Sequence, residues 1–529
     1  MKSFLLKRKF LIVLLAVLIL AGFLRFYNLS EKSFSADEFL GVNTAYGYMK
    51  LGEWRRWDFN LEKPFQDNEY FKTFFDFDIW KDGADTYTRA WIYNWQVAQS
   101  LKFLPDSQEW SYRATSVIWG VLSVLIIYWI AFKFTKNKII GIIAALLMAL
   151  SIDGIEFSRK VRMYAMFMPV FLIFSYTAFL FFESKIKSKW EKLNKLNDKM
   201  GINFVFFLPV IFLGLLSMHL HLLAANFVFI GLIYFLVMGL IVYRKNKNLK
   251  NHYLIYSLIA ILAGIIINLK GNVLLSSLSW ENHFSYFGKS FADYSNVIVA
   301  IILLSVGAYY LIKNKTQEGV YLLVNYSVIF LGAIFLWNRN TGEQYIFFAK
   351  PFQIILIAAG IWAIAEFLKN NLKNYNQKAY IGAIIFLIVA SVNWGYFWAS
   401  ENTYVQTSDS PNPNYRNVFS YIVNKREKND VLITRNFRNF YWQGAKMKVV
   451  SLGGERADES EKKIELENLR QIINSNNSGW IVYSDNDESF FSKEAQTYIV
   501  ENLEKINNLK VRGPINVYYW NNAKPVSRD

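Results

Sequence analysis

The sequence predicts a mainly α-helical, multi-pass membrane protein with a C-terminal soluble α/β domain. Apolar residues, tyrosine included, make up 53% of the 529 residues, a share at or above that of ordinary soluble domains. They cluster in blocks that approach or exceed the ~18 residues of a membrane-spanning helix. Lysines stand in short runs between these blocks, so the net charge of +17 does not indicate nucleic-acid binding. The absence of cysteine excludes a disulfide scaffold and a zinc–thiolate site.

The first apolar block, residues 10–29, follows a basic N-terminal stretch. A signal peptide has a similar charge and an apolar core, but this core is longer. Arg25 and two aromatic residues stand where small residues would mark a cleavage site. We therefore predict an uncleaved anchor helix with its N-terminus in the cytoplasm.

Ten further apolar blocks predict about eleven spans in all, at ~20 residues each. They lie near 111–132, 139–153, 163–182, 203–220, 222–243, 253–269, 292–312, 319–337, 345–367 and 379–399. Segment 88–104 is too polar for lipid and has the pattern of an interfacial amphipathic helix. If this segment does not span, the loops on the same side of the membrane as the N-terminus hold about 22 Lys and Arg residues, and the short loops on the other side hold about 6. This distribution agrees with the positive-inside rule.

Two large segments then face outward, residues 30–110 and the part after residue 400. We expect residues 1–400 to form the membrane domain and residues 401–529 an extracytoplasmic α/β domain, because strand and helix patterns alternate there. The expected helices are 415–424, 461–474 and 493–506, and the expected strands are 430–434, 448–452, 480–484 and 515–520. This part contains no glycine-rich nucleotide motif, so no nucleotide site is predicted.

An acidic pair, Asp37-Glu38, follows the anchor helix directly. It lies close enough to the membrane surface to face a lipid headgroup, and a carboxylate can act as general base toward a hydroxyl nucleophile. The structural alternative is a helix start in which Ser35 caps and the two carboxylates occupy the first turn. The spacing of these residues agrees with both interpretations.

Basic residues stand on the outward side, where Lys and Arg are otherwise scarce. Arg159, Lys160 and Arg162 lie in one short connection, and Arg113 begins the second span. The planar guanidinium group suits bidentate phosphate binding, so an anionic headgroup is one expected ligand. Arginines that extend to ordinary lipid phosphates are the alternative.

Several weaker candidates each have a structural alternative. His219 and His221 contact a substrate or are interfacial histidines. Glu281 and His283 lie in an aromatic loop that touches a sugar or belongs to an aromatic belt. Tyr345 begins a span, where tyrosine is usually an anchor.

An acidic loop resembles a cation-binding loop. Its carboxylates are Asp76, Asp78, Asp82 and Asp85. The full twelve-residue calcium signature is missing, so a solvated loop is the simpler interpretation. No cofactor or metal ligand set is predicted, and a divalent cation stays open.

In this order along the chain, the segments resemble the C-type membrane glycosyltransferases (GT-C). The likeness is to the family 39 group of protein O-mannosyltransferases and aminoarabinose transferases acting on lipid A. Asp37-Glu38 within SADEFLGVNTAYGYMKLGEW resembles the acidic element after their first span. TYTRAWIYNW, WSYRATSVIW and EFSRKVRMYA resemble their basic segments. GEQYIFFAKPF resembles an Arg-Tyr element but has Gln344 in place of arginine.

The resemblance implies a sugar donor on a polyprenyl phosphate and an acceptor hydroxyl on a protein, lipid or glycan at the outer face of the inner or plasma membrane. Transfer would be a single displacement with inversion. Asp37 would be the general base, with Glu38 beside it. The donor phosphate would be bound by Arg89, Arg113, Arg159, Arg162 and Tyr345. Membrane lipids would be further partners and nucleic acid would not.

Two other classes stay open, a lipid or solute transporter and a non-catalytic envelope scaffold. Transporters usually carry ionisable residues at the bilayer midplane and internal repeats. The sequence instead places its ionisable residues at the outward rim and shows no duplicated block of spans. Sugar release from a polyprenyl-phosphate donor by the purified protein would separate the enzyme from both alternatives.

Overall fold

The computed structural model divides the chain into two compact units. It describes residues 2–59, 62–64, 90–247, 251–271, 283–337, 341–371, 377–407, 414–434, 440–441, 447–452, 463–484, 487–507, 509 and 515–522. Unit 1 comprises Met1–Tyr27, Thr115–Arg159 and Met163–Trp398. Unit 2 comprises Asn28–Ala114, Lys160–Arg162 and Ala399–Asp529. The packing therefore groups the first predicted outward segment with the C-terminal residues, and a domain boundary near residue 400 stays a prediction.

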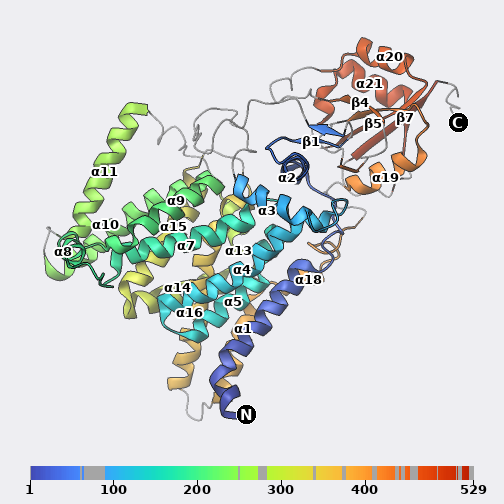
Figure 1. Ribbon diagram of the computed structural model, residues 1–529. Helices are drawn as coiled ribbons and strands as arrows, with labels where there is room; N and C mark the ends of the chain where they lie inside the picture. The colour runs from blue at the N-terminus through green and yellow to red at the C-terminus, as the bar shows by residue number, and fades with distance from the viewer. Residues whose placement is uncertain are drawn as a thin grey trace. The chain divides into compact units, whose positions relative to one another are not determined.

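Unit 1 is helical (Figure 1). Its helices are α1 (Lys2–Phe26), α4 (Glu109–Thr135, whose first turns belong to unit 2), α5 (Lys138–Leu150), α6 (Ile152–Ser158), α7 (Tyr164–Glu183), α8 (Glu191–Met200), η1 (Phe204–Phe206), α9 (Phe207–Leu220), η2 (Leu222–Asn226), α10 (Phe227–Asn246), α11 (His252–Gly271), α13 (Ser285–Phe291), α14 (Val297–Asn314), α15 (Thr316–Phe335), η3 (Glu343–Tyr345), η4 (Phe347–Ala349), α16 (Lys350–Asn371), α17 (Gln377–Ser391) and α18 (Trp394–Trp398). Each of the eleven predicted apolar blocks contains one of these helices.

The apolar helices identify a multi-pass membrane protein. Among the described residues, seven helices are long and apolar enough to span a membrane, or up to nine if each of two bent pairs is one span. Two shorter apolar helices, His252–Leu262 and Gln377–Ser391, fall in further predicted blocks. The predicted class is confirmed, and within the described residues the count of long apolar helices is below eleven because two blocks contain bent helices and α17 has only 15 residues.

Arg25 joins the anchor helix to its neighbour within unit 1. Its side chain is fully buried in the last turn of α1. The Nη1 group donates to the carbonyl of Ala149 at 3.1 Å and the Nη2 group to that of Met148 at 3.0 Å. These carbonyls belong to the last turn of α5, where a cation is favourable because the helix leaves carbonyls unpaired.

Small residues let α14 and α16 approach each other closely. A Cβ atom on Gly307 would lie 1.8 Å from the carbonyl oxygen of Leu356, and one on Gly360 would lie 1.9 Å from that of Leu303. Both positions therefore require glycine. Close backbone approach of this kind is typical of helix packing in membranes.

The predicted interfacial segment contains α3 (Trp91–Leu101), which packs against α2 (Ala36–Leu51) in unit 2. Eleven helical residues extend only ~16 Å, about half the thickness of a bilayer core. α3 therefore cannot span a membrane alone, in agreement with the prediction, and its place at the interface stays a prediction.

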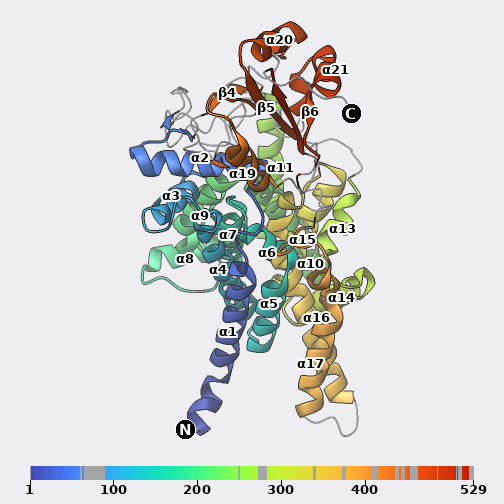
Figure 2. The same cartoon turned by 90° about the vertical axis from the view of Figure 1, so that its right-hand side faces the viewer.

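The C-terminal part of unit 2 contains the predicted α/β layers (Figure 2). Its elements are α19 (Tyr415–Lys425), β3 (Val431–Thr434), β4 (Lys448–Ser451), α20 (Leu466–Asn474), β5 (Ser478–Ser484), η7 (Asp487–Phe490), α21 (Lys493–Asn502), β6 (Glu504–Lys505) and β7 (Ile515–Asn521). A two-stranded sheet of β1 (Trp57–Asp58) and β2 (Lys63–Pro64) lies in the earlier segment.

The five strands lie in the order β4-β3-β5-β7-β6, with β4, β3 and β5 parallel and β7 antiparallel to both of its neighbours. Apolar side chains of α20 and α21 pack on one face of the sheet, and Tyr421 of α19 contacts Trp480 of β5. The helix predicted at 493–506 ends at Asn502 because Glu504 and Lys505 pair with β7.

Candidate functional site

The acidic pair begins helix α2 in unit 2. The backbone N–H of Ser35 donates to Glu38 Oε2 at 2.9 Å, and the Ser35 hydroxyl donates to the same oxygen at 3.3 Å. A carboxylate three residues into a helix is well placed for this bond, which satisfies an otherwise unpaired N–H at the helix start. Glu38 therefore has the helix-start role that was the structural alternative.

Glu38 also pairs with Arg113, 75 residues later in the sequence. Arg113 Nε lies 2.9 Å from Glu38 Oε1, and Nη2 lies 3.0 Å from Oε2. Both residues are buried, with exposed fractions of 3% for Arg113 and 2% for Glu38. The remaining N–H groups of Arg113 donate to the carbonyls of Leu29, Lys32 and Ser33.

All five N–H donors of the Arg113 guanidinium group are therefore occupied by protein oxygens. Binding a phosphate directly would require breaking some of these buried bonds. The contacts instead hold the segment after the anchor helix against the start of α4. This geometry favours a positioning role for Arg113 over the predicted phosphate contact.

The environment of Glu38 keeps its carboxylate ionised. Burial raises the pKa of the Glu38 carboxyl, but the Arg113 guanidinium and the backbone N–H groups of Ser35 and Val161 outweigh burial, so this pKa lies below its ordinary value. The Val161 N–H donates to Oε1 at 3.0 Å. A carboxylate with so many donors and a lowered pKa is a poor proton acceptor.

Asp37 has the opposite environment. Its side chain is 68% exposed, and its Oδ2 lies 3.8 Å from Arg162 Nη2. Arg162 also donates from Nη1 to the backbone carbonyl of Asp37 at 3.2 Å. The structure thus brings together an accessible carboxylate and a guanidinium group from two of the predicted segments.

The other predicted residues belong to unit 1 or lie outside the described residues. In unit 1, Arg159 is buried and donates from Nη1 to the carbonyls of Arg25 and Tyr27, at 3.1 and 2.6 Å. Arg159 therefore binds the end of α1, and its phosphate contact stays a prediction. Arg89, Glu281 and the acidic loop at 76–85 lie outside the described residues.

The predicted histidines and Tyr345 belong to unit 1. His221 Nδ1 accepts from the backbone N–H of Leu223 at 3.1 Å, and its ring lies 6.5 Å from that of Tyr345. His219 lies in α9. His283 is half-buried, with its ring 6.3 Å from that of Tyr286. A substrate contact by these residues stays a prediction.

Sequence reasoning missed a buried charged cluster in unit 1. Lys350 Nζ lies 2.9 Å from Asp153 Oδ2 and 3.3 Å from Asp293 Oδ2. Asp293 also accepts from the Ser151 hydroxyl at 2.7 Å and from the backbone N–H of Ile152 at 2.8 Å. Asp153, Asp293 and Lys350 each lie near the predicted outward end of an apolar block. This shared position is the sequence feature that could have indicated the cluster.

Sequence reasoning also missed the contacts within unit 2 between its C-terminal part and the segment after the anchor helix. Arg416 forms an ion pair with Glu109, with Nε 2.8 Å from Oε1. The Tyr441 hydroxyl accepts from the backbone N–H of Phe34 at 2.7 Å and donates to Glu109 Oε1 at 3.1 Å. These contacts stabilise the start of α2.

No group of three or more His, Asp or Glu side chains able to hold a metal ion occurs in the part of the chain that the structure describes. Asp37 and Arg162 offer the chemistry of a carboxylate beside a guanidinium group. Such a pair can accept a proton and bind an anion.

Comparison with known proteins shows the fold. No protein-family model matches the sequence, and no curated protein matches it either. The structure is similar to that of the Archaeoglobus fulgidus oligosaccharyltransferase tethered with an acceptor peptide, with a TM-score of 0.57, 11% identity, and coverage of 91% of this chain and 70% of that chain. It is also similar to ArnT from Cupriavidus metallidurans, in the apo state (TM-score 0.55, 9% identity) and bound to undecaprenyl phosphate (TM-score 0.55, 8% identity), each covering 97% of this chain and 98% of that chain. The protein therefore has the fold of the GT-C membrane glycosyltransferases.

Proposed function

We propose that this protein is a membrane glycosyltransferase that moves a sugar from a polyprenyl-phosphate donor to an acceptor hydroxyl. The N-terminus would lie in the cytoplasm, and Asp37 with the C-terminal domain on the outer side of the membrane. The observation that carries the proposal is the contrast between neighbouring carboxylates. Glu38 is buried and saturated by donors, whereas Asp37 is exposed beside Arg162.

The structural neighbours support a lipid-phosphate donor. One ArnT structure is bound to undecaprenyl phosphate, and a structure of the oligosaccharyltransferase AglB from Archaeoglobus fulgidus contains a dolichol-phosphate. Both ligands are polyprenyl phosphates. An acceptor peptide is present in another oligosaccharyltransferase structure. We propose the same class of donor here and leave the acceptor as a hydroxyl of a protein, lipid or glycan.

In the proposed reaction, Asp37 removes the proton from the acceptor hydroxyl. The acceptor oxygen forms a bond to the anomeric carbon while the bond from that carbon to the phosphate oxygen breaks, with inversion. The electron pair of the breaking bond remains on the polyprenyl phosphate, whose charge grows. Arg162 would stabilise that charge, and Glu38 with Arg113 would position the start of α2.

The test uses Asp37→Asn in the full-length protein with a radiolabelled polyprenyl-phosphate hexose. Loss of a general base is expected to lower turnover by about 10²–10⁴-fold while the amount of protein in the membrane is unchanged. Glu53→Gln is the matched control, because Glu53 is an exposed carboxylate beyond the other end of α2.

A second measurement separates a wrong residue from a wrong function. Mass analysis of the purified wild-type protein should find a co-purified polyprenyl-phosphate sugar. If the sugar lipid is found but Asp37→Asn transfers normally, the base assignment fails and the function stands. If neither donor retention nor transfer is found with any polyprenyl-phosphate sugar, the proposed function is wrong.

A further inference from the structure

The connection between α7 and α9 forms a basic hairpin, residues 184–203, that the proposed reaction does not use. Its lysines are Lys185, Lys187, Lys189, Lys192, Lys195 and Lys199. With Glu191 and Asp198, they give the hairpin a net charge of +4. α7 is a candidate span that ends at Glu183, and α8 and α9 form a bent pair with an angle of 107°. Because apolar helices enter and leave it, the hairpin lies at a membrane surface.

Asparagine side chains give the hairpin a defined shape. Asn194 accepts from the backbone N–H of Ser188 at 2.7 Å and donates to its carbonyl at 2.8 Å. Asn203 donates to the carbonyls of Ser184 and Ile186, at 3.0 and 2.9 Å. Asn197 accepts from the N–H of Phe204 at 3.0 Å. These bonds tie α8 to the connection before it and to the start of η1, and they join the two ends of the hairpin, so the surface is preformed.

The outer face of α8 combines basic and apolar side chains. Lys192, Lys195 and Lys199 follow each other at spacings of three and four residues, which places them on one helical face. Leu196 lies on the same face and is 42% exposed, and Trp190 just before the helix is 74% exposed. Lysines beside exposed aromatic and aliphatic groups are the signature of a helix that binds the surface of an anionic membrane.

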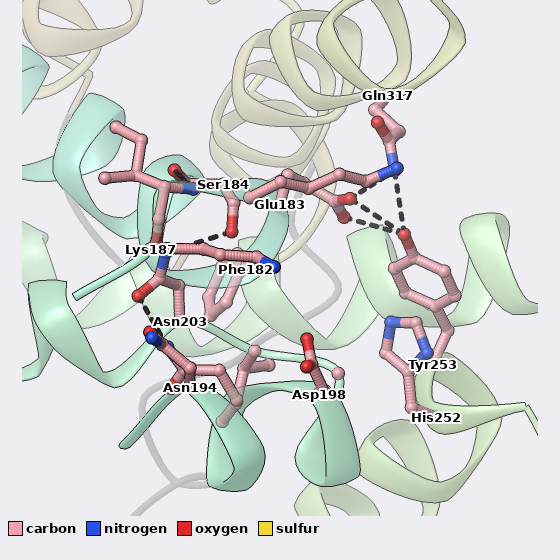
Figure 3. A pocket seen from close by; sticks show the side chains of 15 residues that line it. Phe182, Glu183, Ser184, Lys187, Asn194, Asp198, Asn203, His252, Tyr253 and Gln317 are labelled. Atoms are coloured by element: carbon pink, nitrogen blue, oxygen red, sulfur yellow. Dashed lines mark hydrogen bonds between the residues drawn. The ribbon is translucent and has the colours of Figure 1, made fainter. Parts of the chain in front are cut away.

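A cavity of about 470 Å³ opens beside the hairpin in unit 1 (Figure 3). Lys187, Asn194 and Asn203 lie on one side of it, and Glu183 with Tyr253 and Gln317 on the other. Lys185 also lines the cavity.

The Glu183 carboxylate accepts hydrogen bonds from three neutral groups. Tyr234 donates to Oε1 at 2.6 Å, Tyr253 donates to Oε2 at 2.8 Å, and Gln317 donates as well. These bonds hold the carboxylate in place on its side of the cavity. On the hairpin side, Lys185 and Lys187 present ammonium groups, which are donors that a phosphate needs.

We propose that the basic hairpin is a binding site for acidic phospholipids, with Lys192, Lys195 and Lys199 on the membrane surface and Lys185 and Lys187 at a headgroup position by the cavity. The site is independent of the proposed transfer reaction and of which side of the membrane it faces. An acidic lipid fits because the net charge is positive, the apolar groups beside the lysines are exposed, and the location is interfacial.

The test measures lipid retention by native mass spectrometry of the full-length protein in neutral detergent. Phosphatidylglycerol and phosphatidylcholine are added at equal concentrations. The triple variant Lys192→Gln/Lys195→Gln/Lys199→Gln should bind phosphatidylglycerol about a hundredfold more weakly and phosphatidylcholine unchanged. The control Lys313→Gln/Lys369→Gln/Lys378→Gln removes the same charge from other exposed positions and should change binding less than about twofold. Equal losses in both variants, or none in either, would overturn the proposal.

A label on the hairpin gives a second readout. Because the chain has no cysteine, Leu196→Cys accepts a single environment-sensitive fluorophore. In nanodiscs its emission should indicate an apolar setting when phosphatidylglycerol is present, and high salt should reverse the change. A response to soluble polyglutamate without a response to phosphatidylglycerol would assign the hairpin to an acidic protein partner, and the lipid proposal would be wrong.

Discussion

Each unit of the molecule contains a buried cluster of carboxylates and a cation, and the two clusters differ in the number of carboxyl groups for each cation. In unit 2, one carboxylate, Glu38, faces one guanidinium, Arg113, and every N–H of that guanidinium is used. In unit 1, the single ammonium of Lys350 lies between two carboxylates, Asp153 and Asp293. In the first cluster one carboxylate is paired with one guanidinium group, whereas in the second two carboxyl groups share one ammonium group.

The difference indicates what each cluster does for the fold. A balanced, fully bonded pair fixes its segments and leaves no group for a ligand, so the exposed neighbour Asp37 is the better candidate for chemistry. In the unit 1 cluster, one lysine is the shared partner of two buried carboxyl groups. Removing one partner of a buried pair is costly because the remaining charge is left in a medium that solvates it poorly.

The largest effect is expected for Lys350→Met, which leaves two buried carboxylates without an ammonium group. The expected loss is at or above the about 3–5 kcal/mol typical of breaking one buried pair, measured as a lower midpoint of thermal unfolding in detergent. Lys369→Met on the same helix is the control, because Lys369 is 47% exposed. Adding Asp153→Asn to Lys350→Met should restore part of the loss. Equal shifts for Lys350 and Lys369 would contradict the shared role of Lys350.

The next effect is expected for Arg113→Met, at about 3–5 kcal/mol, because Glu38 would lose its counter-charge and three carbonyls would lose a donor. The thermal unfolding midpoint of Arg113→Lys should lie between those of Arg113→Met and the wild type, since an ammonium group keeps the charge but cannot form the two-point contact. The same thermal assay measures all three proteins. If Arg113→Met unfolds at the same temperature as the wild type, the Glu38–Arg113 pair does not hold the start of α2.

The smallest effect is the pH dependence of the balanced pair. The pKa of Glu38 is lowered in the folded protein, so the folded state binds its proton less readily than the unfolded state. The stability that Glu38 contributes is complete above its unfolded pKa, ~4.3, and is lost as pH falls through the lower folded pKa. On acidification the wild type should therefore lose more thermal stability than Glu38→Gln/Arg113→Met. Parallel curves for the two proteins would contradict this expectation.

Local patterns in the sequence predicted most of the elements. The apolar block at 163–182 is α7 (Tyr164–Glu183) and that at 319–337 is α15 (Thr316–Phe335), because a helix in lipid satisfies its backbone internally and needs only enough consecutive apolar residues. The strand predicted at 480–484 is β5, which is buried along its whole length. Helix ends were less predictable. α21 ends at Asn502 and not at the predicted residue 506, because the next residues form β6, which pairs with β7 about ten residues later in the chain.

The sequence by itself determined the membrane class, the position of most helices and the α/β character of the C-terminal part, and it singled out the Asp37-Glu38 pair as a prediction. Only the tertiary structure decided that Glu38 is bound by Arg113 while Asp37 stays exposed, that Lys350 lies between Asp153 and Asp293, and that the strands follow the order β4-β3-β5-β7-β6. The physical reason is that apolar blocks and helix caps act over a few residues. The partner of a buried charge is chosen by packing between segments far apart in the sequence, such as Glu38 and Arg113 at 75 residues, for which neighbouring residues carry no signal.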